Sequence, residues 1–491
     1  MLRLRRNVSL ALLTATAAAA LAVPAHTTAQ SPAPAPLFED RTAALGLTLG
    51  TADACWVDVD NDGWPDLCAG GAVWRNEKGK RFTRLAEIGG AVTAADFDND
   101  GFVDLFSATQ RKLYRNERGK GFSEFPLPEL PKSVSRAACW GDFNGDGFVD
   151  LYVGGYEDWN AGITYPDLRL MNEGGKAFRL TGTDATFRTR GVTACDFDRD
   201  GYLEIYASHY RLQPNSLLRS DGKGGFADIA AARNAVATSA GFRGGHSIGA
   251  AWGDFDNDGE FDLFAGNFAH RDSRGDQPQS RFLRNLGPDK GFAFEDRGTC
   301  GVFYQESYAS PAAGDFDNDG DLDLFFTTVY PTASFGKKNY PVLFRNDGAF
   351  VFTNATAAAG LAELPATYQA AWADFDRDGD LDLAAGGKLF VNGIDREQPY
   401  RRWLGVRLVG DGKRVNRSAI GAQVRIARGG KTFTRQVEAG TGEGNQNDLT
   451  LHFGLGDRER DVPVTLEVRW PDGTTRTVPN VRTNRYIEIK R

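Results

Sequence analysis

The chain has 491 residues, with 57 Lys and Arg against 65 Asp and Glu and a formal net charge of −8. This length leaves room for more than one domain, and the charge balance does not predict nucleic-acid binding. No nucleophile elbow, phosphate-binding glycine loop, zinc signature or haem motif occurs in the sequence, so nothing in it indicates a particular enzyme class.

The N-terminus is typical of a secretory signal peptide. A basic start, Met1–Arg6, precedes the apolar run Val8–Val23, which predicts a signal peptide over residues 1–29 and a Pro-rich linker over 30–36. A retained membrane anchor is the weaker alternative, because threonines interrupt the apolar run and Pro24 ends it. We therefore expect an exported protein, periplasmic, extracellular or at the cell surface, with no transmembrane segment in the mature chain.

A nine-residue acidic motif, D-x-[DN]-x-D-G-x-x-[DE], occurs seven times. Oxygen ligands at positions 1, 3, 5, 7 and 9, with a turn glycine at position 6, suit a hard cation that takes about six to eight oxygens, so we predict up to seven Ca²⁺ ions. An EF-hand is excluded, because its Glu at position 12 is missing and the flanking residues have strand composition. The motifs begin at Asp58, Asp96, Asp142, Asp196, Asp254, Asp315 and Asp374.

The predicted metal ligands follow from these positions, with the residue at position 7 contributing its carbonyl oxygen. They are Asp58, Asp60, Asp62, Trp64, Asp66, Asp96, Asp98, Asp100, Phe102, Asp104, Asp142, Asn144, Asp146, Phe148, Asp150, Asp196, Asp198, Asp200, Tyr202, Glu204, Asp254, Asp256, Asp258, Glu260, Asp262, Asp315, Asp317, Asp319, Asp321, Asp323, Asp374, Asp376, Asp378, Asp380 and Asp382. Seven bound Ca²⁺ ions would more than offset the net negative charge of the chain.

Short strands flank every loop. An apolar run precedes each motif and an alternating run follows it, and in most repeats an Arg-Asn pair ends a third strand before a Gly-containing turn and a Phe-led fourth strand. Four strands per unit, repeated seven times, predict an all-β fold with a seven-bladed β-propeller over residues 37–395. The strand at Leu37–Thr42 has no unit of its own, so we expect it to complete the seventh blade.

Large and small residues alternate two positions before the loops. The large ones are Trp56, Trp140, Trp252 and Trp372. We expect them to pack in the core rather than to form a ligand platform.

The chain has five cysteines, an odd number. Cys55 and Cys68 lie on either side of the first loop, and the sequence allows either a local disulfide between them or two buried free thiols.

These repeats resemble the FG-GAP and VCBS repeats of integrin-like propellers, and the resemblance implies calcium in the matching loops. From Trp403 the sequence has strands and tight turns without acidic loops, which predicts a separate small β-domain over residues 400–491. Asn416–Val424, His452–Gly456 and Val468–Gly473 resemble the ASPIC/UnbV domain. The whole chain resembles a bacterial member of the cartilage acidic protein family.

One stretch departs from the family pattern. Family members usually carry an aromatic residue near a Ser-Gln pair, whereas this chain has Glu443 in the run Gly442–Gln446. A ligand contact by that aromatic is therefore not carried over. His452 lies in strand-like sequence with no nucleophile partner, so we expect a structural histidine.

The leading functional interpretation is an exported calcium-binding β-propeller protein that acts as a binding or adhesion module for anionic glycans or extracellular proteins. A calcium-dependent polysaccharide lyase or hydrolase is the first alternative, because propellers also host such enzymes. A calcium-stabilised structural spacer is the second. Cleavage of anionic glycans would favour the enzyme, and retention of glycans without a product would favour the binding module. If neither is observed, the spacer is favoured.

Ligand recognition is predicted on the face opposite the acidic loops. The connections between the second and third strands, and between successive units, emerge there and are enlarged in the third to sixth units. Arginines beside aromatic residues suit sugars that carry carboxylate or sulfate. The predicted ligand residues are Arg136, Arg190, Arg243, His246 and Tyr308, and an ordinary solvated surface is the alternative.

Overall fold

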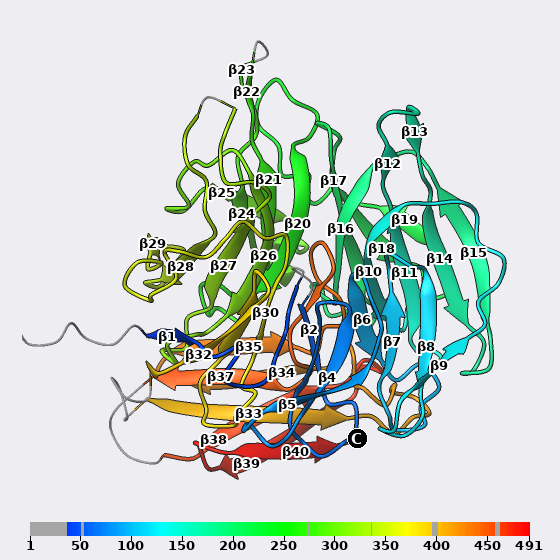
Figure 1. Ribbon diagram of the computed structural model, residues 1–491, viewed down its shortest axis with the longest axis vertical. Helices are drawn as coiled ribbons and strands as arrows, with labels where there is room; N and C mark the ends of the chain where they lie inside the picture. Colours follow the sequence, from blue (N-terminus) through cyan, green and yellow to red (C-terminus); the bar gives the residue numbers. More distant parts are fainter. Residues whose placement is uncertain (1–36, 51–53, 273–274, 335, 395–400, 457–461) are drawn as a thin grey trace, which may run out of the picture. The chain divides into compact units, whose positions relative to one another are not determined.

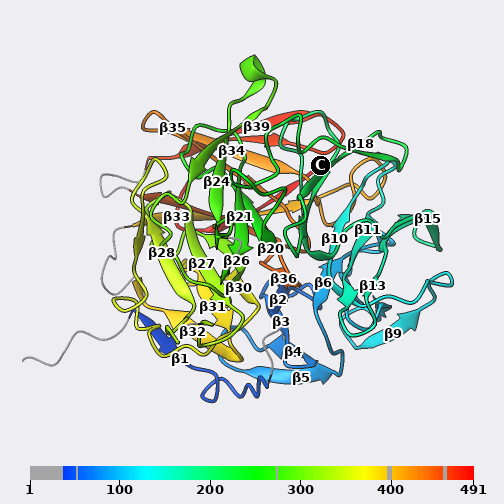
Figure 2. The same cartoon turned by 90° about the horizontal axis from the view of Figure 1, so that it is seen from above.

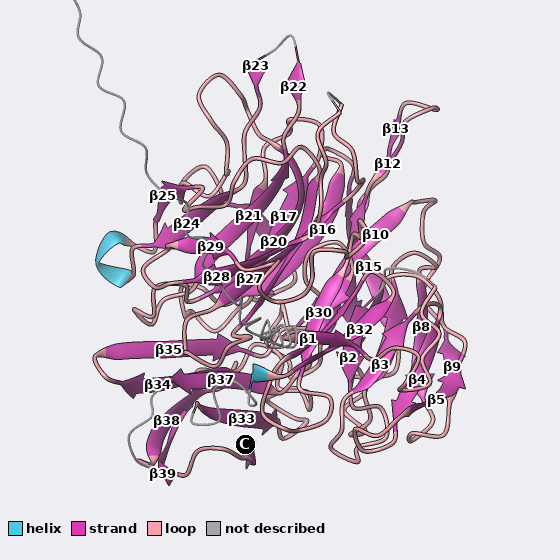
Figure 3. Ribbon diagram, turned by 60° about the vertical axis from the view of Figure 1, so that its left-hand side comes forward, coloured by secondary structure: helices cyan, strands magenta, loops and turns pink. Residues whose placement is uncertain are grey.

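The computed structural model describes residues 37–50, 54–272, 275–334, 336–394, 401–456 and 462–491. The predicted signal peptide and linker, residues 1–36, lie outside the described residues. Strands dominate these ranges (Figure 3), and the 3-10 helix η1 (Pro288–Lys290) is a rare exception. Within them, no helix is long and apolar enough to cross a membrane. The all-β class is confirmed.

Seven antiparallel sheets, each of four repeat-derived strands, follow one another along the described chain (Figure 1). The first sheet contains β2 (Ala54–Val57), β3 (Asp66–Ala69), β4 (Ala72–Asn76) and β5 (Phe82–Ala86). The next three contain β6 (Val92–Ala95), β7 (Asp104–Ser107), β8 (Lys112–Asn116) and β9 (Phe122–Phe125); β10 (Ser135–Gly141), β11 (Asp150–Gly155), β14 (Asp167–Asn172) and β15 (Phe178–Asp184); and β16 (Thr189–Cys195), β17 (Glu204–His209), β18 (Ser216–Ser220) and β19 (Phe226–Asp228).

The last three sheets have the same order. They contain β20 (His246–Gly253), β21 (Asp262–Phe268), β24 (Arg281–Asn285) and β25 (Phe294–Gly298); β26 (Tyr308–Gly314), β27 (Asp323–Thr328), β28 (Val342–Asn346) and β29 (Phe352–Asn354); and β30 (Ala370–Ala373), β31 (Asp382–Ala385), β32 (Lys388–Asn392) and β1 (Phe38–Asp40). Two small hairpins extend the β11–β14 and β21–β24 connections: β12 (Glu157–Asp158) with β13 (Ile163–Thr164), and β22 (Arg271–Asp272) with β23 (Gly275–Asp276).

The first strands of the seven sheets form a closed series. β2 contacts β6, β6 contacts β10, and the order continues through β16, β20, β26 and β30 back to β2. Several of these inner strands surround the short strand β36 (Asn445–Gln446) in the view of Figure 2. Each acidic loop joins the first and second strands of its sheet, so the loops gather at one end of the inner strands.

The N-terminal strand completes the seventh sheet, as predicted. β1 pairs antiparallel with β32, with Phe38 opposite Asn392. The Phe38 side chain is buried, and its ring centroid lies 6.0 Å from that of Phe316 and 6.1 Å from that of Trp372. This pairing removes an unpaired strand edge and places apolar area in the core.

A ring of side-chain hydrogen bonds connects each sheet to the one before it. Asn116 Nδ2 donates to the carbonyl oxygen of Val59 in the first sheet at 2.8 Å. Asn76 closes the ring by donating to the carbonyl oxygen of Phe375 in the seventh sheet at 2.8 Å. The other donors are Asn172, Ser220, Asn285, Asn346 and Asn392, which bind the carbonyl oxygens of Phe97, Phe143, Phe197, Phe255 and Phe316. The Arg-Asn signature thus has a structural role that the sequence interpretation did not assign.

The tryptophans before the loops are core residues, as predicted. All four are at most 4% exposed. Trp56 stacks on Phe375 with 6.2 Å between ring centroids, and Trp252 stacks on Phe197 at 5.8 Å. Both phenylalanines are the second residue of the preceding acidic loop, so the tryptophans also join neighbouring sheets.

All five cysteines lie in the described ranges and are free thiols, with Cys55 and Cys68 directly opposite each other on β2 and β3. A contact with Cys55 and burial hold the pKa of the Cys68 thiol well above its usual value. Both thiols are buried. Of the disulfide and the two free thiols that the sequence allows, the structure contains the free thiols.

The C-terminal strands form two further sheets. In one, β33 (Arg402–Val409) lies between β37 (Leu451–Gly456) and β40 (Tyr486–Lys490); in the other, the order is β35 (Lys431–Gln436), β34 (Gln423–Arg428), β38 (Val464–Arg469) and β39 (Thr475–Val481). The strand β36 pairs in parallel with β2 instead. The sequence predicts a small β-domain over residues 400–491, and its described strands lie in the same compact unit as the repeats.

The reason is a segment at residues 439–448, the axial segment, which runs among the inner strands. Trp140 N donates to Ala439 O at 2.9 Å, and Val192 N donates to Gly442 O at 3.0 Å. A Cβ atom added at Gly249 would lie 3.1 Å from the Gly442 Cα atom, so the small residues of the inner strands leave the space that the segment fills. This packing connects residues far apart in sequence, which local patterns cannot reveal.

Candidate functional site

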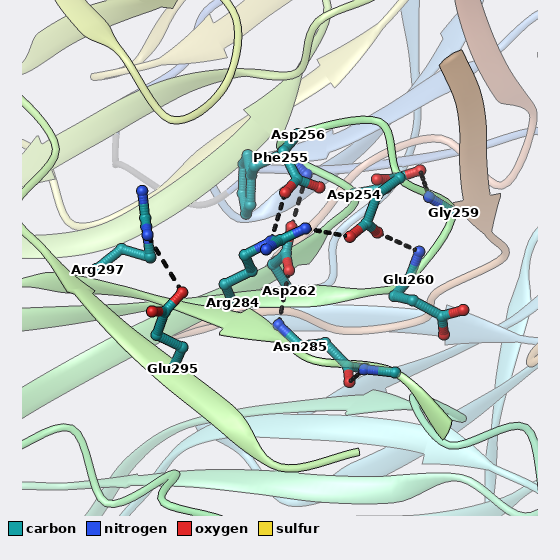
Figure 4. A network of polar contacts seen from close by, with 12 residues as sticks. Asp254, Phe255, Asp256, Gly259, Glu260, Asp262, Arg284, Asn285, Glu295 and Arg297 are labelled. Atoms are coloured by element: carbon teal, nitrogen blue, oxygen red, sulfur yellow. Dashed lines mark hydrogen bonds and ion pairs between the residues drawn. The ribbon is translucent and has the colours of Figure 1, made fainter. Parts of the chain in front are cut away.

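The acidic loops share one backbone conformation, which the loop at Asp254 illustrates (Figure 4). Asp254 Oδ2 accepts a hydrogen bond from Gly259 N at 3.2 Å, and Asp258 Oδ1 accepts one from Glu260 N at 2.9 Å. Gly259 has φ 97°, a conformation that favours glycine. These bonds turn the chain sharply and bring the carboxylates of the loop together.

The last carboxylate of the motif is fixed by the sheet. Asp262 Oδ2 accepts from Phe255 N at 3.0 Å and Asp262 Oδ1 accepts from Asn285 N at 2.8 Å. The same two kinds of amide bind the final aspartate in five other loops. Glu204 differs, because both of its carboxylate oxygens are buried without a hydrogen-bond partner among the described residues.

Position 4 of the motif carries a signal that the sequence interpretation missed. It adopts a left-handed conformation in all seven loops, where Asn and Gly are the favoured residues. The residues are Asn61, Asn99, Gly145, Arg199, Asn257, Asn318 and Arg377. Asn61 Nδ2 donates to Gly101 O of the next loop at 2.7 Å, so this position also joins loops.

Each loop concentrates carboxylates in a poorly solvated place. Burial raises the pKa of Asp254 to about 8, despite the nearby Arg435, and the charges of Asp258 and Asp256 add to the effect. Burial likewise raises the pKa of Asp374 to about 8. The pKa of Asp378 rises to about 9 for the same reason, with further contributions from the neighbouring loop carboxylates. Carboxylates in such surroundings are costly to ionise without a cation.

Three of the predicted ligands come together in each of five loops. In the groups named here, one oxygen from each carboxylate lies within 4.8 Å of the others. The groups are Asp58, Asp60 and Asp62; Asp96, Asp98 and Asp104; Asp196, Asp198 and Glu204; Asp254, Asp256 and Asp262; and Asp315, Asp317 and Asp323. Buried oxygens without a hydrogen-bond partner among the described residues include Asp196 Oδ1, Asp254 Oδ1 and Asp374 Oδ1. This donor set fits a hard divalent cation such as Ca²⁺.

Arginines of the Arg-Asn signature also face the loops. Arg284 donates to Asp256 Oδ2 at 2.6 Å and to Asp258 Oδ2 at 2.8 Å. Arg115 lies 2.6 Å from Asp98 in an equivalent ion pair. The Glu260 side chain, at position 7, instead lies 2.8 Å from Arg199 in an ion pair.

The C-terminal domain contacts the same loops. Arg407 lies 2.6 Å from Asp58, and Lys431 lies 2.7 Å from Asp321. Further bonds join Arg401 to Asp317, Thr434 N to Asp254 Oδ2, and Tyr486 to Asp374. Through these bonds the C-terminal domain contacts four of the loops directly, and the sequence does not predict these contacts.

His452 occupies a structural position in this interface. One ring nitrogen lies 2.7 Å from Asn318 Oδ1, and burial, with Arg435 nearby, lowers the pKa of His452 to about 3. A neutral imidazole that binds an asparagine side chain matches the structural histidine that the sequence predicts.

The predicted ligand residues on the opposite face need correction. Arg190, His246 and Tyr308 are buried, with Arg190 only 5% exposed, so they are not presented at the surface of the protein. Of this set, Arg243 is exposed and the Arg136 side chain is 41% exposed. Arg136, Arg190, His246 and Tyr308 lie at the starts of inner strands, as predicted, but the sequence does not show that Glu443 of the axial segment binds Arg136 and Arg190.

Comparisons with known proteins agree with this architecture. The model of the FG-GAP-like repeat matches residues 96–153 and 196–265, and the model named ASPIC and UnbV matches residues 412–491. The chain therefore combines FG-GAP-like repeats with a C-terminal ASPIC and UnbV domain, a combination that suggests a β-propeller binding module. It is homologous to cartilage acidic protein 1: the Mus musculus and Homo sapiens proteins are each 27% identical to it, over 289 residues and 56% of this chain.

The match spans 41% of the Mus musculus protein and 40% of the Homo sapiens protein, so this chain corresponds to less than half of these relatives. Similar solved structures include an Agrocybe aegerita lectin that recognises non-reducing terminal N-acetylglucosamine, with 14% identity and a TM-score of 0.40 over 64% of this chain and 81% of the lectin. Another is rhamnogalacturonan lyase YesW, with 13% identity and a TM-score of 0.29 over 90% of this chain and 91% of the lyase.

Proposed function

We propose that this is an exported calcium-binding β-propeller protein that acts as a binding module for anionic glycans or extracellular proteins. The observation that carries the calcium proposal is the set of buried loop carboxylates whose oxygens lack hydrogen-bond partners among the described residues. Ca²⁺ would compensate the charge of these groups and join the two strands that each loop connects. Export is proposed from the N-terminal sequence alone.

Metal analysis and thermal unfolding test the calcium proposal. Protein dialysed against calcium should retain several ions per chain, up to seven, and EDTA should lower the melting temperature. Each site stabilises the fold by roughly 2.7 kcal/mol when free calcium exceeds its Kd a hundredfold. Replacing Asp254 and Asp256 with Asn should remove one ion, whereas Glu295→Gln, at an exposed position of β25, should remove none. An unchanged melting temperature in EDTA would refute the proposal.

The proposed recognition face carries aromatic and basic groups in the connections at the ends of the sheets away from the loops. Trp159, in the β12–β13 hairpin, is 66% exposed, and the Arg211 guanidinium lies 3.6 Å from its ring centroid. Arg271 lies 4.4 Å from the ring centroid of Tyr304. Both hairpins, β12–β13 and β22–β23, extend on the side away from the C-terminal strands (Figure 1). Such pairs suit sugars that bear carboxylate or sulfate groups.

A glycan array with added calcium tests this part of the proposal. Retention of anionic glycans that is lost in Trp159→Ala, with an unchanged melting temperature, would support recognition at this face. An exposed residue elsewhere, Val351→Ala, serves as the matched control. Release of a cleaved product would favour the lyase or hydrolase alternative. Absence of retention on glycans and of capture by extracellular proteins would favour the spacer.

A further inference from the structure

The axial segment carries one acidic side chain into a cluster of basic and aromatic groups. Glu443 is 1% exposed, and Arg136 and Arg190 stand at the starts of β10 and β16, the ends away from the acidic loops. Arg190 Nη2 donates to both Glu443 oxygens, at 2.9 and 2.8 Å, and Arg136 Nη1 donates to Oε1 at 3.1 Å. These bonds join residues separated by 253 and 307 positions in the sequence.

Three tyrosine rings enclose the Arg190 guanidinium. Its central carbon lies 5.1 Å from the ring centroid of Tyr156, 5.2 Å from that of Tyr210 and 5.4 Å from that of Tyr368. The rings come from three different sheets, following β11 and β17 and preceding β30. Aromatic faces stabilise a cation while they exclude water, so the guanidinium keeps its charge in a place of low polarity. We name these two arginines and three tyrosines the carboxylate cage.

The carboxylate cage has more donor capacity than Glu443 uses. Arg190 binds the carboxylate through a single nitrogen, Nη2, rather than through its two-pronged edge. The Nε atoms of Arg190 and Arg136 are buried and have no hydrogen-bond partner among the described residues. Two guanidinium groups therefore face one carboxylate, and the excess positive charge favours an anion.

We infer that the carboxylate cage is a monocarboxylate-binding site whose resident ligand is the chain's own Glu443. The site holds the C-terminal domain to the repeats by binding this side chain as it would bind a free carboxylate. In the native chain the tether keeps Glu443 at a high effective concentration, so free carboxylates do not displace it at millimolar levels. Removal of the side chain leaves a vacant site of matching charge and size. The inference does not depend on calcium or on a glycan ligand.

Chemical rescue of the full chain tests the inference, with sodium acetate as the probe and sodium chloride at equal ionic strength as the salt control. Glu443→Ala should melt below the native protein, and acetate should raise its melting temperature in a saturable way by about 2 °C or more. Native protein should show no acetate-specific rise. If the variant does not fold in chloride, the yield of soluble protein on refolding in acetate replaces the melting temperature as the readout.

Two further variants make the outcome specific. Glu443→Gln fills the site with a neutral side chain of the same shape, so acetate should not stabilise it. Glu438→Ala removes a half-buried carboxylate outside the cage, whose pKa is raised to about 8 by loss of solvation, and should also show no rescue. Equal effects of acetate and chloride on Glu443→Ala would overturn the inference. Equal rescue of all three variants would also overturn it, as would a Glu443→Ala protein that melts at the native temperature.

Discussion

The ring of asparagines between the sheets makes a measurable prediction. Asn346 is fully buried, and Asn346→Ala removes three hydrogen bonds: from Nδ2 to Phe255 O at 2.9 Å, from Nδ2 to Leu322 O at 3.1 Å, and from Gly348 N to Oδ1 at 3.0 Å. Each buried group left without a partner costs about 1–3 kcal/mol, and the three losses share one cavity, so we expect the free energy of unfolding to fall by about 3–5 kcal/mol.

Urea denaturation in the presence of calcium measures this loss. Asn346→Ser should cost roughly half as much, because Ser220 fills the equivalent place in the fourth sheet with one bond to Phe143 O at 2.6 Å and one from Gly222 N at 3.1 Å. Arg345→Ala, in the same strand, should cost less than about 1 kcal/mol, because the Arg345 ion pair with Asp347 is exposed. A loss below about 1 kcal/mol in Asn346→Ala would refute the reasoning.

Three other perturbations have defined outcomes. Deletion of residues 37–46 should expose the edge of β32 and cause aggregation by light scattering; a soluble protein with native melting would contradict the pairing. Gly249→Val should lower the melting temperature by crowding Ser310 and the axial segment, whereas Gly50→Ala, with open space around it, should not. Burial lowers the pKa of His209 to about 3, below its unfolded value, so the stability that its neutral form contributes is complete above about pH 6.5 and is lost as the pH falls towards 3. His209→Gln should flatten the stability profile measured by urea between pH 6.5 and 4, and an identical profile would refute this assignment.

Local sequence signals were sufficient for the repeat architecture. The spacing from Asp254 to Asp262 defines the loop and the two strands that it joins, because the turn glycine and the alternating apolar residues act over a few positions. The pairing of β1 with β32 was also predictable, since the sequence around Phe38 matches a fourth strand and the seventh unit lacks one. Position 4 of the motif is Asn or Gly in five of the seven loops, but the left-handed conformation that explains this preference is seen only in the backbone.

The axial segment could not be predicted for a different reason. Glu443 and Arg190 meet only because the inner strands surround residues 439–448, and no pattern within either stretch specifies that pairing. The sequence did place Arg190 at the correct end of its strand. A buried arginine and an arginine exposed at the surface have the same local sequence here, so the burial of Arg190 against Glu443 could not be predicted.

Charge connects the loops to the C-terminal domain. The loop at Asp254 contains five carboxylates, four of them predicted side-chain ligands, and the proposed Ca²⁺ would compensate two of these charges. Arg284 bonds Asp256 and Asp258. Burial lowers the pKa of Arg435, and the charges of Asp315 and Asp254 act against this effect, so Arg435 interacts with two loops. Residues 401–491 contain 18 Lys and Arg against 10 Asp and Glu, a positive excess that suits an acidic surface. The proposed cation and the C-terminal domain would therefore offset different parts of the same negative charge. Each would lower the electrostatic cost of ionising the loop carboxylates, and so each would favour binding of the other.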